Sequence, residues 1–163
     1  MHLRNLLVVV LAALSLAGTG DSQSSVTEIR PPTQSLSWDS DGCAGEMLAV
    51  VSGCPSQQNA PFVIRLRMAK SLMIPSHTHP IDENITVLRG ELTFRLAEGA
   101  TTILVRLRQG DFFRIPAYVP HSAEAVQETE IQTYGIGPLV TTWTKERCKP
   151  AQHMAPIQMK CGP

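Results

Sequence analysis

The sequence has no excess of either charge and few aromatic residues. Among its 163 residues, 14 are Lys or Arg and 14 are Asp or Glu, so the formal net charge is zero. A nucleic-acid-binding protein usually carries a basic stripe, and no such stripe is present. Aromatic residues make up 5% of the chain, which also argues against a platform that stacks single-stranded bases. We therefore expect no nucleic-acid partner.

The chain also lacks an apolar run long enough to span a membrane. Its longest, Leu6 to Ala17, has 12 residues and is interrupted only by Ser15, whereas a spanning helix needs about 20. His2 and Arg4 precede this run, and Ser15-Leu16-Ala17 fits the small-x-small rule for cleavage by signal peptidase. We predict a signal peptide over residues 1–17, no stable membrane anchor, and a secreted or periplasmic protein.

Cysteine is scarce, and none of the four shows the Cys-x2-Cys spacing of a zinc knuckle. Cys43, Cys54, Cys148 and Cys161 all follow the predicted signal peptide, which favours two disulfides over the alternative of four buried thiols. The apolar run Glu46 to Val51 predicts a strand that would hold Cys43 and Cys54 about 25 Å apart. A disulfide needs Cα atoms within about 7 Å. We expect these two cysteines to pair with Cys148 and Cys161, in either order.

No segment has a convincing helical period, and short strand-like segments follow one another from residue 62 onward. Phe62 to Met68, Leu92 to Leu96 and Thr102 to Leu107 alternate between apolar and polar residues. Turn signals separate these segments at short intervals, which predicts an all-β barrel or sandwich. We divide the chain into the signal peptide, a flexible lead (18–35), one barrel domain (36–144) and an irregular tail (145–163).

Two histidines and a glutamate lie close together in the segment 75–90. His77 and His79 stand at i and i+2, so on a strand both side chains point to the same side. Pro80 then interrupts the strand, and Glu83 can return a carboxylate toward the imidazoles. Two imidazoles and a carboxylate on one face suit a divalent first-row metal ion.

A second segment, Gly110 to His121, follows the pattern Gly-x5-Pro-x4-His and supplies a third imidazole. Together with His-x-His-x3-Glu-x6-Gly in the first segment, it resembles the paired motifs of the cupin superfamily. Ser71 and Tyr118 replace glycines of the family pattern, and Ala125 replaces its asparagine. The resemblance implies an all-β single cupin barrel, a jelly roll of six to ten antiparallel strands. It also implies that the metal ligands are His77, His79, Glu83 and His121.

Together with the predicted signal peptide, this resemblance implies an exported metalloenzyme that acts on a small organic molecule, as a dioxygenase, decarboxylase, isomerase or lyase. The expected cofactor is one divalent metal ion, manganese or iron before nickel, zinc or copper. Glu83 doubles as the candidate catalytic residue, because a carboxylate that leaves the metal can move a proton. The alternatives are a non-catalytic binding or sensor protein that uses the metal, and a purely structural metal. A homodimer is compatible with all of these alternatives.

The alternation of side chains along a strand predicts which neighbours of the ligands also point inward. If His121 points inward, Ala123 and Ala125 share its side, and alanine at position 125 would open space beside the metal. Arg65, Arg67 and Arg114 are expected on solvated faces, with contact to a substrate carboxylate as the alternative. The expected cavity walls are Phe112, Phe113, Met73 and Tyr118. A disulfide-held tail is preferred to the alternative of a soft copper site built from His153, Met154 and Met159.

Overall fold

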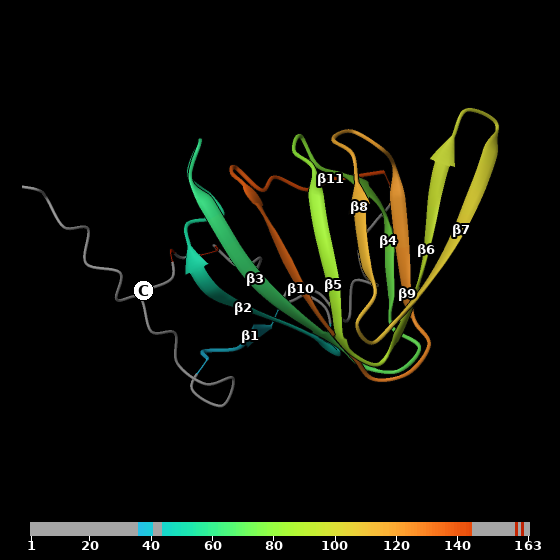
Figure 1. Cartoon of the computed structure of the whole chain (residues 1–163), viewed down its shortest axis with the longest axis horizontal. Helices are drawn as coiled ribbons and strands as arrows, with labels where there is room; N and C mark the ends of the chain where they lie inside the picture. The colour runs from blue at the N-terminus through green and yellow to red at the C-terminus, as the bar shows by residue number, and fades with distance from the viewer. Residues whose placement is uncertain (1–35, 41–43, 145–158, 160, 162–163) are drawn as a thin grey trace, which may run out of the picture.

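The computed structural model describes residues 36–40, 44–144, 159 and 161, and within them it contains eleven β-strands and no helix (Figure 1). In chain order the strands are β1 (Asp39–Ser40), β2 (Glu46–Gly53), β3 (Pro61–Met68), β4 (Met73–Thr78), β5 (Glu83–Arg89), β6 (Glu91–Glu98), β7 (Thr101–Arg108), β8 (Phe112–Ile115), β9 (His121–Ala125), β10 (Thr129–Ile136) and β11 (Thr142–Trp143). The count exceeds the expected six to ten because β1 and β11 are two-residue strands.

Two antiparallel sheets form the fold and face each other in Figure 1. One has the strand order β1-β2-β3-β10-β5-β8, and the other has the order β11-β4-β9-β6-β7. Strands far apart in the sequence are therefore neighbours, as when β10 lies between β3 and β5. This arrangement confirms the predicted all-β jelly roll. No described segment forms a helix with the length and apolarity that crossing a membrane requires.

The predicted signal peptide, the lead (18–35) and all but two residues of the tail lie outside the described residues. Within the described part, β1 begins at Asp39, and Thr142 and Trp143 pair with β4. The backbone N–H of Leu139, which precedes β11, donates to the carbonyl of Pro55 in a loop contact.

The core between the sheets follows the predicted alternation. On β6, Leu92, Phe94 and Leu96 are buried, and each such side chain contributes about 1.5–3 kcal/mol through its removal from water. Arg95, on the opposite face of β6, pairs with Glu124 of β9. The arginines expected on solvated faces behave in the same way. Arg65 and Arg67 pair with Glu130, and Arg114 pairs with Asp82.

The two residues that replace family glycines keep the left-handed backbone that favours glycine. Ser71 has φ +65° and Tyr118 has φ +63°, a conformation that costs a residue with a Cβ atom roughly 1–2 kcal/mol. Hydrogen bonds hold both turns, since the N–H of Ser71 donates to the carbonyl of Ala125 and that of Tyr118 to the carbonyl of His79. The backbone turn is thus retained although the glycine is not.

Gly90, which closes the first motif, is tightly enclosed. It has φ +88°, and a Cβ atom there would lie 2.4 Å from the carbonyl oxygen of Glu128 and 2.6 Å from Oγ1 of Thr129. We expect Gly90→Ala to lower the free energy of unfolding by roughly 3 kcal/mol, because a backbone clash adds to the left-handed strain.

Gly110 provides the matched control, because it has φ +89° and open space around the Cβ position. Gly110→Ala should cost only the strain, roughly 1–2 kcal/mol. Urea denaturation of both variants measures the two losses. Equal losses would show that the contact with residues 128 and 129 has no energetic weight.

A disulfide joins Cys54, which follows β2, to Cys161 near the C-terminus. The Cα atoms are 4.1 Å apart, and 107 residues separate the two cysteines in the sequence. The prediction that Cys54 pairs with a tail cysteine rather than with Cys43 is confirmed. Cys43 and Cys148 lie outside the described residues. A disulfide fits an oxidising compartment.

Candidate metal centre and its cavity

Three strands from both sheets bring the predicted ligands to one end of the barrel. His77, near the end of β4, lies directly opposite His121, the first residue of β9, in the antiparallel register. His79 follows immediately after β4 and stays on the same side as His77. Glu83 is the first residue of β5 and approaches from the other sheet.

Backbone contacts hold the two motif segments together. The N–H of Tyr118 donates to the carbonyl of His79 at 2.8 Å, and the N–H of Ala117 donates to Oδ1 of Asp82 at 2.9 Å. The hydrogen bond from Ala117, followed by the guanidinium of Arg114, holds the pKa of Asp82 below its usual value. Since Asp82 precedes Glu83, these contacts fix where β5 begins.

The four predicted side chains converge. One nitrogen from each of His77, His79 and His121 lies within 4.8 Å of the other two. Oε2 of Glu83 is 3.2 Å from Nε2 of His121 and 3.8 Å from Nε2 of His79. The histidines are 2–7% exposed, and the Glu83 side chain is 15% exposed. A three-histidine group of this kind can hold a metal ion; the role of each residue as a ligand stays a prediction.

Each imidazole is oriented by a backbone carbonyl on its far side. Nδ1 of His77 lies 2.7 Å from the carbonyl oxygen of Pro75. Nδ1 of His79 is 3.0 Å from that of Val140, and Nδ1 of His121 is 2.9 Å from that of Val119. A carbonyl only accepts, so in all three rings the proton belongs on Nδ1 and the lone pair on Nε2. This is how proteins orient histidines that bind metals.

The resulting cluster requires a positive charge. Nε2 of His121 is buried and has no hydrogen-bond partner among the described residues, although the Glu83 carboxylate lies beside it. Lone pairs from the imidazoles therefore face those of a carboxylate, and only a cation between them turns repulsion into attraction. A divalent metal ion satisfies all four groups, whereas a single proton satisfies two. The donor set thus fits a metal.

Burial shapes the protonation of the cluster. Removal from water, reinforced by the neighbouring charge of His121, lowers the pKa of His77 to about 4. Burial likewise lowers the pKa of His79, against the opposing charge of Glu83. Burial acts to raise the pKa of Glu83, but the nearby imidazoles, His121 above all, hold it below its usual value. Near neutral pH His77 and His79 are therefore neutral and Glu83 is ionised, which are the forms that bind metals.

These shifts make the metal-free protein sensitive to acid. A histidine whose pKa is lower in the folded state than in the unfolded state lowers the free energy of unfolding once the unfolded state begins to bind a proton. This loss of stability begins as the pH falls below about 6.5. From pH 6.5 to 4, the shift of His77 alone should cost roughly 3 kcal/mol. Glu83, whose pKa is lowered in the folded state, adds to this loss of stability once the pH falls below the ordinary pKa of a glutamate. Urea unfolding of chelated protein at pH 7.5, 6, 5 and 4 measures this slope, which His77→Asn should reduce. Constant stability over this range would contradict the assignment.

The imidazoles open into an internal cavity of about 310 Å³. Glu46, Glu83, Thr133 and Thr141 are the polar residues on its wall besides the three histidines. The rest of the wall is apolar and consists of Leu48, Ile64, Leu66, Met68, Ile74, Leu92, Phe94, Ala123, Ile131, Leu139, Trp143 and Met159. A mainly apolar cavity with a few convergent polar groups is typical of a small-molecule site.

None of the four residues expected as cavity walls lines the cavity. Phe112, Met73 and Tyr118 are 54–70% exposed, and Phe113 packs against the core rather than lining the cavity. Ala123 lines the cavity as parity predicts, but Ala125 does not. Ala125 is fully buried opposite Leu92 in the core, so it opens no space beside the metal site.

Comparison with known proteins assigns the segment that carries the candidate site to a family. Residues 65–136, which hold both histidine motifs, match the family model of the cupin domain. This segment is a cupin domain. The match also accounts for the left-handed backbone at Tyr118, because the cupin motif places a glycine there.

Individual proteins resemble parts of this chain. A 3-hydroxyanthranilate 3,4-dioxygenase of Ruegeria pomeroyi is 36% identical over 55 residues, which cover 34% of this chain and 31% of that protein. A variant of Bacillus subtilis oxalate decarboxylase superposes with TM-score 0.59 at 15% identity, over 74% of this chain and 33% of the other. KdgF from Halomonas sp. superposes with TM-score 0.55 at 20% identity, over 68% of this chain and 96% of the other. The first two matches span about a third of those proteins, and both structures show the fold alone.

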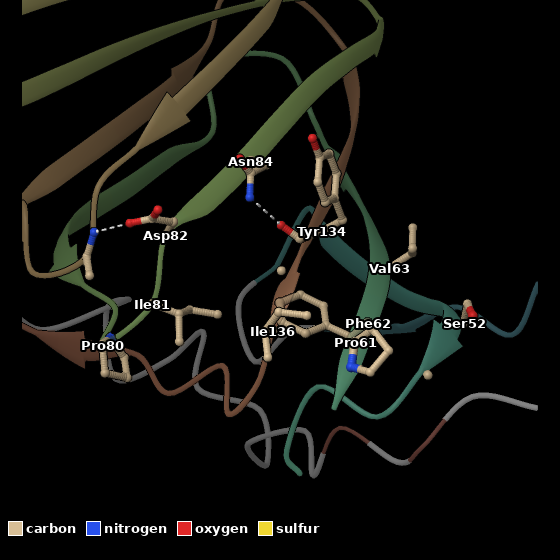
Figure 2. Close-up of a pocket in the computed structure, with 13 residues that line it drawn as sticks. Ser52, Pro61, Phe62, Val63, Pro80, Ile81, Asp82, Asn84, Tyr134 and Ile136 are labelled. Carbon is tan, nitrogen blue, oxygen red and sulfur yellow. Dashed lines mark hydrogen bonds between the residues drawn. The ribbon is translucent and has the colours of Figure 1, made fainter. Parts of the chain in front are cut away.

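A second hollow, of about 920 Å³, lies on the outer face of the cupin domain where β3, β10 and β5 adjoin (Figure 2). Val63, Tyr134 and Ile136 are among its apolar residues, and Nδ2 of Asn84 donates to the carbonyl of Tyr134. Although this hollow is larger than the internal cavity, none of the predicted ligands lines it. The chemistry of the site therefore belongs to the smaller cavity.

Several site residues were not predicted from the sequence. Trp143 of β11 stacks obliquely on His77 with ring centroids 4.8 Å apart, and Oγ1 of Thr141 lies 3.5 Å from Nδ1 of His79. Met159 reaches the cavity from the tail. The carbonyls that orient the imidazoles belong to residues of any type, so the sequence carries no signal for them. The pairing of β11 with β4 is the feature that brings Trp143 to His77.

Proposed function

We propose that this protein is a metal-dependent enzyme that acts on a small organic molecule in its cupin barrel. The metal is held by Nε2 of His77, His79 and His121 and by the carboxylate of Glu83. The observation that carries this proposal is the hydrogen bond between Nδ1 of each imidazole and a backbone carbonyl, which places the proton on Nδ1. It leaves three lone pairs and a carboxylate that converge on the wall of an apolar cavity.

The proposed metal is manganese or iron. Three imidazoles and a carboxylate leave room on a six-coordinate ion for substrate or water, and both metals accept this mixed donor set. Nickel, zinc and copper bind such donors as well, so availability in the compartment decides among them. When bound, the metal supplies Lewis acidity and a fixed place for an anionic oxygen.

The protein's own residues bind and orient the substrate. The described cavity wall contains no Lys or Arg, so the metal is the cation that binds the anionic end of a substrate. The aliphatic and aromatic wall excludes water and packs against an apolar body. Phenols, diketones and small carboxylates have this combination. The likeness to a dioxygenase over 55 residues supports oxygenase chemistry over a purely structural metal.

Glu83 is the proposed proton-transfer residue. It is the only carboxylate among the four converging groups, and the nearby imidazoles keep it ionised at neutral pH. An ionised carboxylate beside the substrate position can accept a proton from a bound phenol or diketone and return it later.

We further propose that the enzyme works outside the cytoplasm. The Cys54–Cys161 disulfide supports this location, and so does the signal-peptide pattern at residues 1–17.

The proposal is tested by metal analysis followed by a turnover screen. The purified protein is reconstituted with Mn²⁺ or Fe²⁺, its metal content is measured by mass spectrometry, and oxygen uptake and product masses are recorded with phenols, diketones and dicarboxylates. We expect one metal per chain and turnover of at least one substrate class, both absent in His121→Ala. One metal per chain with reversible anion binding but no turnover would favour the non-catalytic binding protein. No stoichiometric metal would overturn the proposal.

A further inference from the structure

A methionine that lies two residues before Cys161 reaches the cavity that holds the imidazoles. Met159 lines this cavity together with the three histidines and Glu83. It also packs against an apolar cluster of Leu48, Phe62, Ile64 and Leu139, on the inner side of β2 and β3 and the loop after β10. The C-terminal tail thus supplies part of the wall of a site that is otherwise built from the barrel.

The position of Met159 is fixed covalently. Cys161, two residues further along the chain, is bonded to Cys54 directly after β2. The Oγ of Ser56, two residues beyond Cys54, donates to the carbonyl of Met159 at 3.5 Å. Cys54 is buried in the barrel rim, and its N–H donates to the carbonyl of Pro61 at the start of β3. The disulfide therefore ties Met159 to the rigid sheet.

From this placement we infer that Met159 is a specificity-determining residue: held by the Cys54–Cys161 disulfide, it limits the size of the molecule that fits beside the metal. The inference rests on the proposed function, because it names the residue that selects among ligands of the same site. Methionine is long and flexible, so it fills space at an irregular boundary. A hydrophobic wall that gains or loses a methylene group changes discrimination about 10–200-fold.

The experiment uses the Co²⁺-loaded full chain and carboxylates of graded size as probes. Acetate, benzoate and 2-naphthoate are titrated, and binding is followed through the visible absorption of the cobalt. In the wild type, we expect acetate and benzoate to bind and naphthoate to bind much more weakly. Met159→Ala removes the side chain beyond Cβ and should tighten naphthoate binding about tenfold or more, while acetate changes by less than about twofold.

Two further variants make the result specific. Met73→Ala makes the same change at an exposed methionine of β4 that does not line the cavity, and it should bind all probes like the wild type. Met159→Phe should weaken naphthoate binding further, which keeps the test open if Met159→Ala does not fold. Identical naphthoate affinity in the wild type and in the folded Met159 variants would overturn the inference.

The role of the disulfide is tested by the double variant Cys54→Ser/Cys161→Ser. It frees Met159 from the sheet and should shift naphthoate affinity in the same direction as Met159→Ala. A double variant with wild-type discrimination would show that Met159 does not depend on the disulfide. If no carboxylate perturbs the cobalt spectrum of the wild type, the proposed function fails; if acetate binds but size discrimination is unchanged across the variants, only the inference about Met159 fails.

Discussion

Glu83→Gln is expected to abolish turnover while the protein remains folded. The amide has nearly the shape of the carboxylate but neither its charge nor its basicity, so the cluster loses its only anion and its proton acceptor. Loss of proton transfer alone costs roughly 10²–10⁴-fold in rate. Metal affinity should also fall, because the site then offers three neutral nitrogens and a weak amide oxygen to a divalent ion.

Turnover, metal affinity and circular dichroism of Glu83→Gln separate these effects. Glu124→Gln is the matched control: Glu124 lies on β9, pairs with Arg95 on the outer face and is partly exposed. This control should retain both metal and activity. Full activity in metal-loaded Glu83→Gln would show that the carboxylate takes no part in the chemistry.

Replacing His121 by Ala is expected to remove the metal site with little change in the metal-free fold. The imidazole is 2% exposed, and its Nε2 has no hydrogen-bond partner among the described residues. Such a buried group costs about 1–3 kcal/mol when unsatisfied, which partly offsets the packing lost on truncation. In the presence of metal, by contrast, the variant loses one of three nitrogen ligands.

Thermal unfolding with and without metal tests this prediction. A ligand at 1,000 times its dissociation constant stabilises the folded state by about 4 kcal/mol. The wild type should therefore melt at a clearly higher temperature with saturating Mn²⁺ or Fe²⁺, and His121→Ala should show almost no metal-dependent rise. If the variant retained the full rise, His121 would not be a ligand.

The sequence was sufficient to bring the four candidate ligands together because two kinds of signal agreed. Spacing at i and i+2 placed His77 and His79 on one side of a strand, and the second motif supplied His121. In the structure, His77 and His121 face each other across β4 and β9. Pairing between strands distant in the sequence is not encoded in either segment alone, so the resemblance to the cupin motifs was needed to connect them.

The alternation along β9 correctly predicted which side chains point inward, but not which of them reach the cavity. Ala125 points inward, as expected from His121, yet four residues along a strand correspond to roughly 13 Å. It therefore packs in the core against Leu92, away from the cavity. Phe112 and Phe113 alternate as strand neighbours must, and Phe112 lies outside against Tyr134 with ring centroids 6.5 Å apart. Hydrophobicity alone does not distinguish a cavity wall from a core or an exposed face.

Contacts made by loops and by the tail could not be predicted from local pattern. The carbonyl of Val140 orients His79, and the neighbouring Leu139 is tied to Pro55 beside the disulfide. Met159 was considered only for a copper site in the tail, but it packs in the barrel cavity. These placements depend on the closed fold, and the disulfide partner of Cys54 was predicted only as one of two tail cysteines.

Anomalous diffraction from a crystal of the Mn²⁺- or Fe²⁺-loaded protein tests the central claim most directly, because it locates the metal and its donor atoms. We predict a single peak inside the barrel, about 2.1 Å from Nε2 of His77, His79 and His121, with Glu83 as the fourth protein ligand and each Nδ1 still bonded to its backbone carbonyl. A peak at another place, coordination through Nδ1, or no peak in protein soaked at saturating metal would contradict it.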